Sequence, residues 1–177
     1  IRFCETTMVY RDEQSGELSG LARVLSITQD DAHVFCRESQ LETEMGNVWD
    51  IISEFYGTFG FSLVPRFSRR DPALPEKYMG STDGWDKAES AIKNLIDARS
   101  SDTWIDGPGE AAFYGPKIDF MAKDSIGRTW QVATIQLDFV QPVNLELEFV
   151  NDEGKKETPV MIHCAVMGSL ERFMSAF

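Results

Sequence analysis

The sequence contains two segments with apolar residues at helical spacing, placed among several short segments that favour strands. This order of expected helices and strands limits the chain to folds in which helices pack on a sheet. The first helix is expected to begin at a capping box, Ser39-Gln-Leu-Glu42 with Ser39 as N-cap, and to end at Gly57 and Gly60. The second is expected over residues 85–99, with a cap among residues 81–83. The apolar positions at helical spacing are Leu41, Met45, Val48, Ile52 and Phe55 in the first helix and Ala88, Ile92, Leu95 and Ile96 in the second.

The strand-like segments are short and separated by turn-forming residues. Residues 12–17 form a polar connection, while 125–127 and 151–154 have the composition of hairpin turns. A last helix is expected to begin at residues 168–169. These features predict an antiparallel β-sheet flanked by helices, an α+β fold. The expected strands are residues 2–11, 22–28, 61–67, 118–123, 129–139, 145–150 and 159–165.

Composition bounds the class of protein. A chain of 177 residues with 42% hydrophobic content fits one domain with a substantial core, and no apolar run approaches the roughly 20 residues that span a bilayer. The net charge of −12 argues against a general affinity for nucleic acid. Three scattered cysteines favour reduced thiols and a cytoplasmic location, with an organelle as the alternative. The chain has no secretory signal, and it opens on Ile1 without an initiator Met, in what looks like the middle of a strand, so we expect it to be part of a larger protein.

Arg11 and Arg23 flank the first polar connection. Guanidinium groups on two paired strands can clamp a polyphosphate, and Glu13 beside them can orient a base or an amine. Taken alone, a solvated surface cluster is the more common meaning of such residues.

Asp31 and His33 would share one face of a strand, and His163 lies on another expected strand. Two imidazoles form an incomplete zinc site, because zinc usually takes at least three protein ligands. Spacing alone favours two core histidines.

Tyr114 and Lys117 lie in a Gly- and Pro-rich stretch that keeps the backbone close to whatever binds there. On the strand that follows, Thr134 and Gln136 share a face, and Gln131 points to the opposite face unless a bulge intervenes.

Ser169 and Arg172 open the last helix, where backbone N–H groups favour anions. The alternative for Ser169 is helix capping.

Together these segments resemble the catalytic core of class II aminoacyl-tRNA synthetases, and most specifically the threonyl-tRNA synthetase family. Residues 8–13 and 29–36 are similar to motif 2, and 161–173 to motif 3. Residues 109–120 and 130–139 are similar to the central strands of that family. The resemblance covers nearly the whole chain, residues 1–177, as one catalytic domain.

The resemblance implies ATP, with Mg²⁺, as one substrate. Arg11 would hold the α-phosphate and stabilise charge as the threonine carboxylate attacks it, and Lys117 and Arg172 would complete the catalytic set. The implied ATP contacts are Arg11, Glu13, Arg23, Gln131 and Arg172.

It also implies L-threonine and tRNA(Thr) as partners, through threonyl-adenylate formation and transfer to the tRNA 3′ end. Zinc would be held by His33, His163 and a cysteine outside this chain, and would bind the amino and hydroxyl groups of threonine. The implied threonine contacts are Gln29, Asp31, Tyr114, Thr134, Gln136 and Ser169.

The chain departs from the family pattern in several places. Motif 1, the editing and anticodon-binding domains and the Met-Asn-Cys-Pro-Gly-His segment fall outside it, so the homodimer expected of the family depends on parts not in view. Leu25-Ser26-Ile27 replaces an Arg-Gly-Phe run, and Cys164 replaces an arginine. The alternative is therefore a weak or inactive class II paralogue that acts as a binding or regulatory module.

Overall fold

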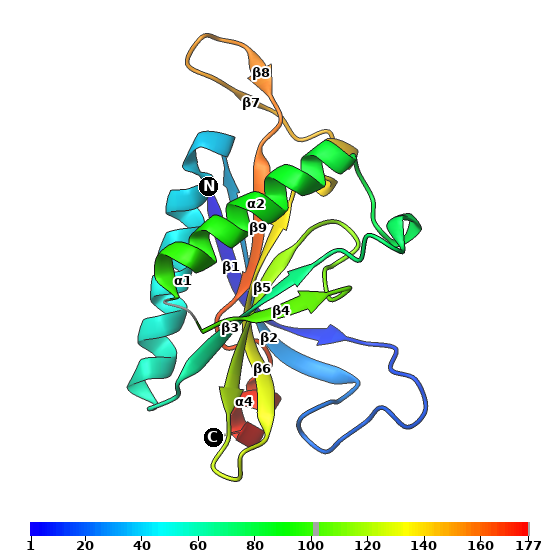
Figure 1. Cartoon of the computed structure of the whole chain (residues 1–177), viewed down its shortest axis with the longest axis vertical. Helices are drawn as coiled ribbons and strands as arrows, with labels where there is room; N and C mark the ends of the chain where they lie inside the picture. Colours follow the sequence, from blue (N-terminus) through cyan, green and yellow to red (C-terminus); the bar gives the residue numbers. More distant parts are fainter. Residues whose placement is uncertain (101–102, 177) are drawn as a thin grey trace.

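The computed structural model describes residues 1–100 and 103–176, and a seven-stranded sheet forms its centre (Figure 1). Neighbouring strands are antiparallel except for β3 and β4, which are parallel. The predicted α+β architecture is therefore confirmed, with one parallel pair at an edge. In spatial order the strands are β1 (Arg2–Tyr10), β2 (Ser26–Cys36), β9 (Val160–Ala165), β6 (Thr129–Asp138), β5 (Lys117–Lys123), β3 (Leu63–Arg69) and β4 (Ile105–Pro108).

Two long helices, α1 (Leu41–Thr58) and α2 (Thr82–Arg99), cover one face of the sheet (Figure 1). The apolar stripe predicted for each helix packs on the inward-facing residues of the strands. Ile52 and Ile92 are fully buried, and burial of such a side chain stabilises the fold by about 1.5–3 kcal/mol. One face of the sheet is thus part of the hydrophobic core, and polar side chains can lie on the opposite face.

The predicted N-cap of α2 is confirmed, whereas that of α1 is wrong. Ser81 caps α2, because its Oγ accepts a hydrogen bond from Gly84 N at 3.1 Å. The prediction of Ser39 as N-cap of the first helix was wrong. Ser39 lies inside a 3-10 helix, η1 (Glu38–Gln40), and the turn closes when Arg37 N donates to Gln40 Oε1 at 3.1 Å.

Two strand predictions were wrong in extent. Residues 22–25 are not part of a strand, because Ala22 closes a turn by donating to Ser19 O at 3.0 Å and Arg23 forms an isolated bridge with Ser19, so β2 begins only at Ser26. Most of residues 145–150 is not strand, because a short helix, α3 (Gln141–Asn144), precedes it. Only β7 (Phe149–Val150) pairs, with β8 (Lys156–Glu157), across the predicted 151–154 turn.

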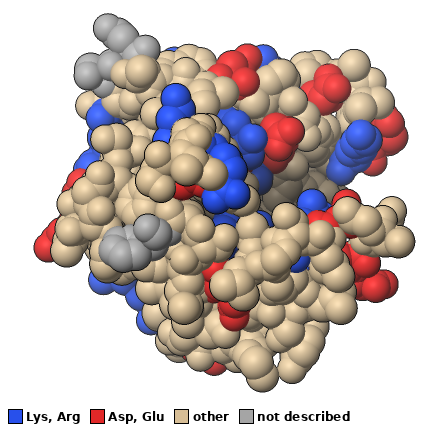
Figure 2. All heavy atoms as spheres, turned by 90° about the horizontal axis from the view of Figure 1, so that it is seen from below, with Lys and Arg blue, Asp and Glu red and all other residues tan. Residues whose placement is uncertain are grey.

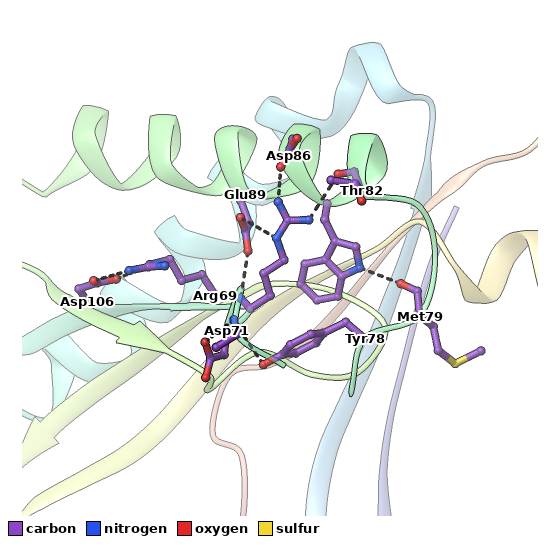
Figure 3. Close-up of polar contacts among 11 residues, drawn as sticks. Arg69, Asp71, Tyr78, Met79, Thr82, Asp86, Glu89 and Asp106 are labelled. Atoms are coloured by element: carbon purple, nitrogen blue, oxygen red, sulfur yellow. Dashed lines mark hydrogen bonds and ion pairs between the residues drawn. The ribbon is translucent and has the colours of Figure 1, made fainter. Parts of the chain in front are cut away.

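The connection between β3 and α2, which contains the 3-10 helix η2 (Pro75–Lys77), is held by side-chain contacts (Figure 3). Asp71 N donates to Tyr78 Oη at 3.0 Å, and Trp85 Nε1 donates to Met79 O at 2.7 Å. These contacts fix the start of α2 against the edge of the sheet. Further ion pairs join Arg70 to Asp86 and Glu89, and Arg69 to Asp106.

The chain closes with a helix at one end of the sheet. This helix, α4 (Leu170–Ala176), begins where Ser169 Oγ accepts a hydrogen bond from Arg172 N at 3.2 Å, which confirms the capping role. Phe173 packs against Phe55 and Phe59 at the end of α1. Nowhere in residues 1–100 and 103–176 is a helix long and apolar enough to cross a bilayer.

Candidate functional site

A cleft opens on the sheet face opposite α1 and α2, and nine of the residues predicted to bind ligands line it, whereas Asp31, His33, Tyr114, Lys117 and His163 do not. Side chains alternate along a strand, so residues between the buried core positions of β6 point into this cleft. Ile27 also contributes to its wall. The predicted site residues that line the cleft are Arg11, Glu13, Arg23, Gln29, Gln131, Thr134, Gln136, Ser169 and Arg172.

A β-bulge brings Gln131 to the same face as Thr134 and Gln136. The register between β5 and β6 shifts so that Phe120 faces Ala133 and the next residue faces Gln131. One extra residue in a strand reverses the alternation of side chains beyond it. The bulge thus resolves the alternative that alternation alone left open for Gln131.

Basic side chains converge at one end of the cleft, near the β1–β2 connection. Arg23 Nη2 pairs with Glu13 Oε2 at 2.8 Å, and this hydrogen bond lowers the pKa of Glu13. Arg172 is anchored by Nε, which donates to Ala22 O at 3.0 Å. Burial, and then the charges of Arg11 and Arg23, lower the pKa of Arg172, so an anion placed among these three arginines would relieve their repulsion. Figure 2 views this end of the molecule and shows Lys and Arg side chains beside a hollow.

Asp119 organises the floor of the site from β5. Its side chain is fully buried, and five side chains donate to its two oxygens. A buried carboxylate held by several donors is a fixed point from which the donors take their orientation. The donors are Arg66 Nη2 (2.9 Å), Ser68 Oγ (2.7 Å) and Lys117 Nζ (2.9 Å) on Oδ2, and Gln131 Nε2 (2.7 Å) and Thr134 Oγ1 (3.2 Å) on Oδ1.

The two histidines lie next to each other beyond the cleft. His33 on β2 faces His163 on β9, with ring centroids 4.7 Å apart. Burial lowers the pKa of His33, which favours the neutral imidazole that metals bind. Tyr114 stacks at 5.0 Å from His163, and its hydroxyl group donates to Gln136 Oε1. Burial raises the pKa of Tyr114 to about 12, so it remains a neutral donor.

These residues fit part of a zinc site. The second nitrogen of a zinc-bound histidine usually donates to a carboxylate, and His163 Nε2 lies 2.8 Å from Asp138 Oδ2. Asp31 lies two residues before His33 on the same strand and raises its pKa in opposition to burial. Among the described residues, no group of three or more His, Cys, Asp or Glu side chains is placed to hold a metal. The two imidazoles therefore need a further ligand from elsewhere.

Carboxylates also connect the strand that carries His33 to the segment before α4. Asp30 accepts backbone hydrogen bonds from Val166, Met167 and Gly168 at 2.7–3.0 Å. A side chain at Gly168 is excluded, because its φ is +70° and a Cβ would lie 2.8 Å from Val132 O. This tight turn places Ser169 at the edge of the cleft.

The departures from the family pattern occupy different places. Ile27 is 8% exposed and lines the cleft, whereas Leu25 is 51% exposed. Cys164 belongs to the core beneath the helices, and its Sγ lies 3.6 Å from Ala32 O. The Cys164 substitution is therefore not in the cleft.

Residue patterns missed three carboxylates near the site, of which Asp119 and Asp138 are fully buried and Asp30 is half-buried. For Asp119 a signal existed, because it lies two residues after Lys117 and so shares its strand face. Its partners Arg66 and Ser68 come from β3, whose pairing with β5 is not apparent in the residue pattern.

Comparison with known proteins agrees with this geometry. The model of the "tRNA synthetase class II core domain (G, H, P, S and T)" family matches residues 1–177. The threonine–tRNA ligase of Rubrobacter xylanophilus is 49% identical over 99% of this chain, and that of Parabacteroides distasonis is equally similar. The chain spans 27% of each of these two proteins.

Solved structures show the same relationship. The RNA binding domain of threonyl-tRNA synthetase from Cryptosporidium parvum superposes with a TM-score of 0.92 and 39% identity, over 99% of this chain and 43% of that one. A putative threonyl-tRNA synthetase from Aeropyrum pernix gives 0.82 and 33%, over 98% of this chain and 40% of that one. Giardia lamblia prolyl-tRNA synthetase shares the fold alone. Its TM-score is 0.63 and its identity is 14%, over 99% of this chain and 28% of that one. This chain belongs to the class II tRNA synthetase core-domain family, and the relatives described here that are at least 33% identical to it are named as threonine enzymes.

Proposed function

We propose that the protein containing this chain activates L-threonine with ATP to form threonyl-adenylate, and transfers the threonyl group to the 3′ end of tRNA(Thr). The observation that supports this most is that one cleft gathers nine residues from β2, β6, the β1–β2 connection and the start of α4. These are nine of the eleven residues for which the family resemblance implies contacts with ATP or threonine.

The ATP end of the site would be the arginine cluster. Arg11 would hold the α-phosphate and stabilise the negative charge that develops as the threonine carboxylate attacks it. Arg172, positioned by Ala22 O, and Lys117, positioned by Asp119, would complete the catalytic set. Glu13 and Arg23 would fix the adenine and the terminal phosphates, with Mg²⁺ as the counter-ion of ATP.

The threonine end would lie toward the two histidines. His33 and His163, with a cysteine outside this chain, would hold zinc, which when bound would take the amino and hydroxyl groups of threonine. Tyr114 orients Gln136 through its hydroxyl group, and Gln136 is the strand neighbour of His163. The remaining threonine contacts would be Gln29, Asp31, Thr134 and Ser169.

Parts outside the chain would complete the protein. We propose a cytoplasmic homodimer in which motif 1, an anticodon-binding domain and, where present, an editing domain lie beyond this catalytic domain. Within residues 1–100 and 103–176, β1 is an edge strand of the sheet, and Phe3 and Tyr10 on it are 63% and 75% exposed. An exposed apolar edge strand favours coverage by another segment or subunit.

A second candidate is a class II paralogue with weak ATP binding, which acts as a binding or regulatory module. Ile27 supports it, because this side chain lines the cleft where the family has an aromatic residue that would stack on adenine. Stacking of a base on an aromatic ring contributes about 1–3 kcal/mol, and isoleucine has no π face. The intact arginine cluster favours the enzyme.

Binding of a non-hydrolysable threonyl-adenylate analogue, the 5′-sulfamoyl compound, distinguishes the two candidates. The enzyme should bind the threonyl analogue far more tightly than the valyl analogue, by calorimetry with zinc present. Ile27→Phe should change the affinity modestly in the enzyme. Binding that appears only in Ile27→Phe would favour the paralogue, and no binding by either protein would contradict the proposed site.

A further inference from the structure

Asp138, at the end of β6, is a buried carboxylate that is not among the residues proposed to bind ATP, threonine or zinc. We propose that Asp138 is a positioning residue that sets the proton of His163 and thereby makes His163 competent to bind zinc. This inference rests on the zinc site of the proposed function and names the residue that prepares it.

Asp138 has no freedom to turn away from His163. Its side chain is 0% exposed, and its Oδ1 accepts hydrogen bonds from Val140 N and Gln141 N, both at 2.8 Å. These two bonds fix the carboxylate at the start of α3. The second oxygen, Oδ2, then lies 2.8 Å from His163 Nε2.

The chemistry of this contact decides where the imidazole proton lies. A carboxylate oxygen only accepts hydrogen bonds, so Nε2 of His163 must be the donor. A neutral imidazole carries one ring proton, and Nδ1 therefore keeps the lone pair that a metal needs. The ring itself is held from two sides by His33 and Tyr114, with centroids 4.7 and 5.0 Å away.

Asp138 also has a structural role as the cap of α3, and the two roles use different oxygens. Capping of α3 uses Oδ1, whereas the contact with the imidazole uses Oδ2. Asp138→Asn keeps an oxygen for the two backbone amides but offers an NH₂ group to Nε2. Because Nε2 must then accept a hydrogen bond from the NH₂ group, the ring proton of His163 moves to Nδ1. A protonated Nδ1 has no lone pair for a metal.

Asp124 offers a matched control, because it is another aspartate of low exposure that accepts backbone hydrogen bonds in a turn. Its Oδ1 accepts from Ile126 N at 3.1 Å and Arg128 N at 2.8 Å, in the β5–β6 hairpin. Asp124→Asn therefore repeats the chemical change without touching a histidine.

The test compares the full-length wild type, Asp138→Asn and Asp124→Asn by competition for zinc with a chromophoric chelator. Thermal unfolding of the zinc-free proteins reports stability, and the visible absorption of the cobalt-substituted proteins reports the ligand set. We expect Asp138→Asn to raise the zinc dissociation constant about 10–100-fold. Its cobalt band should also change, while Asp124→Asn binds zinc as the wild type does.

Equal zinc affinity and cobalt spectra for wild type and Asp138→Asn would overturn the inference and leave the zinc site standing. A loss of zinc affinity in both variants that follows their loss of thermal stability would overturn it too, because the effect would then be structural. A wild type that binds no zinc would overturn the proposed zinc site, and the inference with it.

Discussion

His33 and His163 lie directly opposite each other on neighbouring antiparallel strands, with ring centroids 4.7 Å apart. They are separated by most of the sequence and are the two histidines of the chain. The same face carries Gln136, which is the neighbour of His163 on the other side. This pair of imidazoles beside a polar cleft is compatible with the proposed zinc site, which needs a further ligand.

Replacement of His33 by alanine should greatly reduce the preference for threonine over valine. A site that contacts a substrate hydroxyl group rejects an analogue without it by about 10⁴-fold, and removal of a zinc ligand should lower this ratio by on the order of 100-fold. Steady-state activation of the two amino acids by the full-length protein measures the ratio. Binding of ATP alone should persist, and an unchanged ratio would contradict the metal assignment.

Arg11→Gln should lower the rate of threonine activation by about 10²–10³-fold, because it removes a charge placed to stabilise the transition state. The fold should be unaffected, since Arg11 is exposed. Arg2→Gln is the control, because Arg2 lies on β1 and pairs with Glu44. Comparable loss in both variants would show that charge in general, rather than Arg11, is responsible.

The three cysteines should react at very different rates. Cys4 is exposed, whereas burial raises the pKa of Cys36 to about 11 and that of Cys164 to about 12. Since the thiolate is the reactive form, iodoacetamide at pH 8 should alkylate Cys4 alone until denaturant is added. Peptide mass mapping checks this, and early labelling of Cys164 would contradict its place in the core.

Asp124 should make stability depend on pH in the acid range. Hydrogen bonds from the Trp130 indole and from Arg128 lower the pKa of Asp124 in the folded state. The unfolded chain therefore binds the proton more readily, and the stabilisation is present above about pH 4 and lost as the pH falls below it. The difference in unfolding free energy between wild type and Asp124→Asn should shrink from pH 7 to pH 3, and a constant difference would disprove the linkage.

Local patterns predicted elements whose cause is local. The stripes of α1 and α2 and the turn at Asp124–Arg128 follow from periodicity and turn chemistry within a few residues. Not every missed feature has a distant cause. The parallel pairing of β4 with β3 joins segments that are far apart in the sequence. The short helix at Gln141–Asn144 has a local cap from Asp138, and the strands predicted on either side of it left only a short connection between them.

The site residues also fall into those that short sequence motifs identify and those that only contacts between strands identify. Cleft residues such as Arg11 and Arg172 could be named because motif 2 and motif 3 are recognisable as short runs. For Asp119, alternation indicates only that it shares a strand face with Lys117, whereas its role depends on five donors from three strands. A buried carboxylate is understood only once its partners are in place.

ATP–pyrophosphate exchange measures threonine activation, the first step of the proposed reaction. The full-length protein, with zinc present, should exchange pyrophosphate into ATP when threonine is added and much less with valine. Arg11→Gln should lose this exchange and Arg2→Gln should keep it. Absence of threonine-dependent exchange in the wild type would contradict the account and would favour the non-catalytic paralogue.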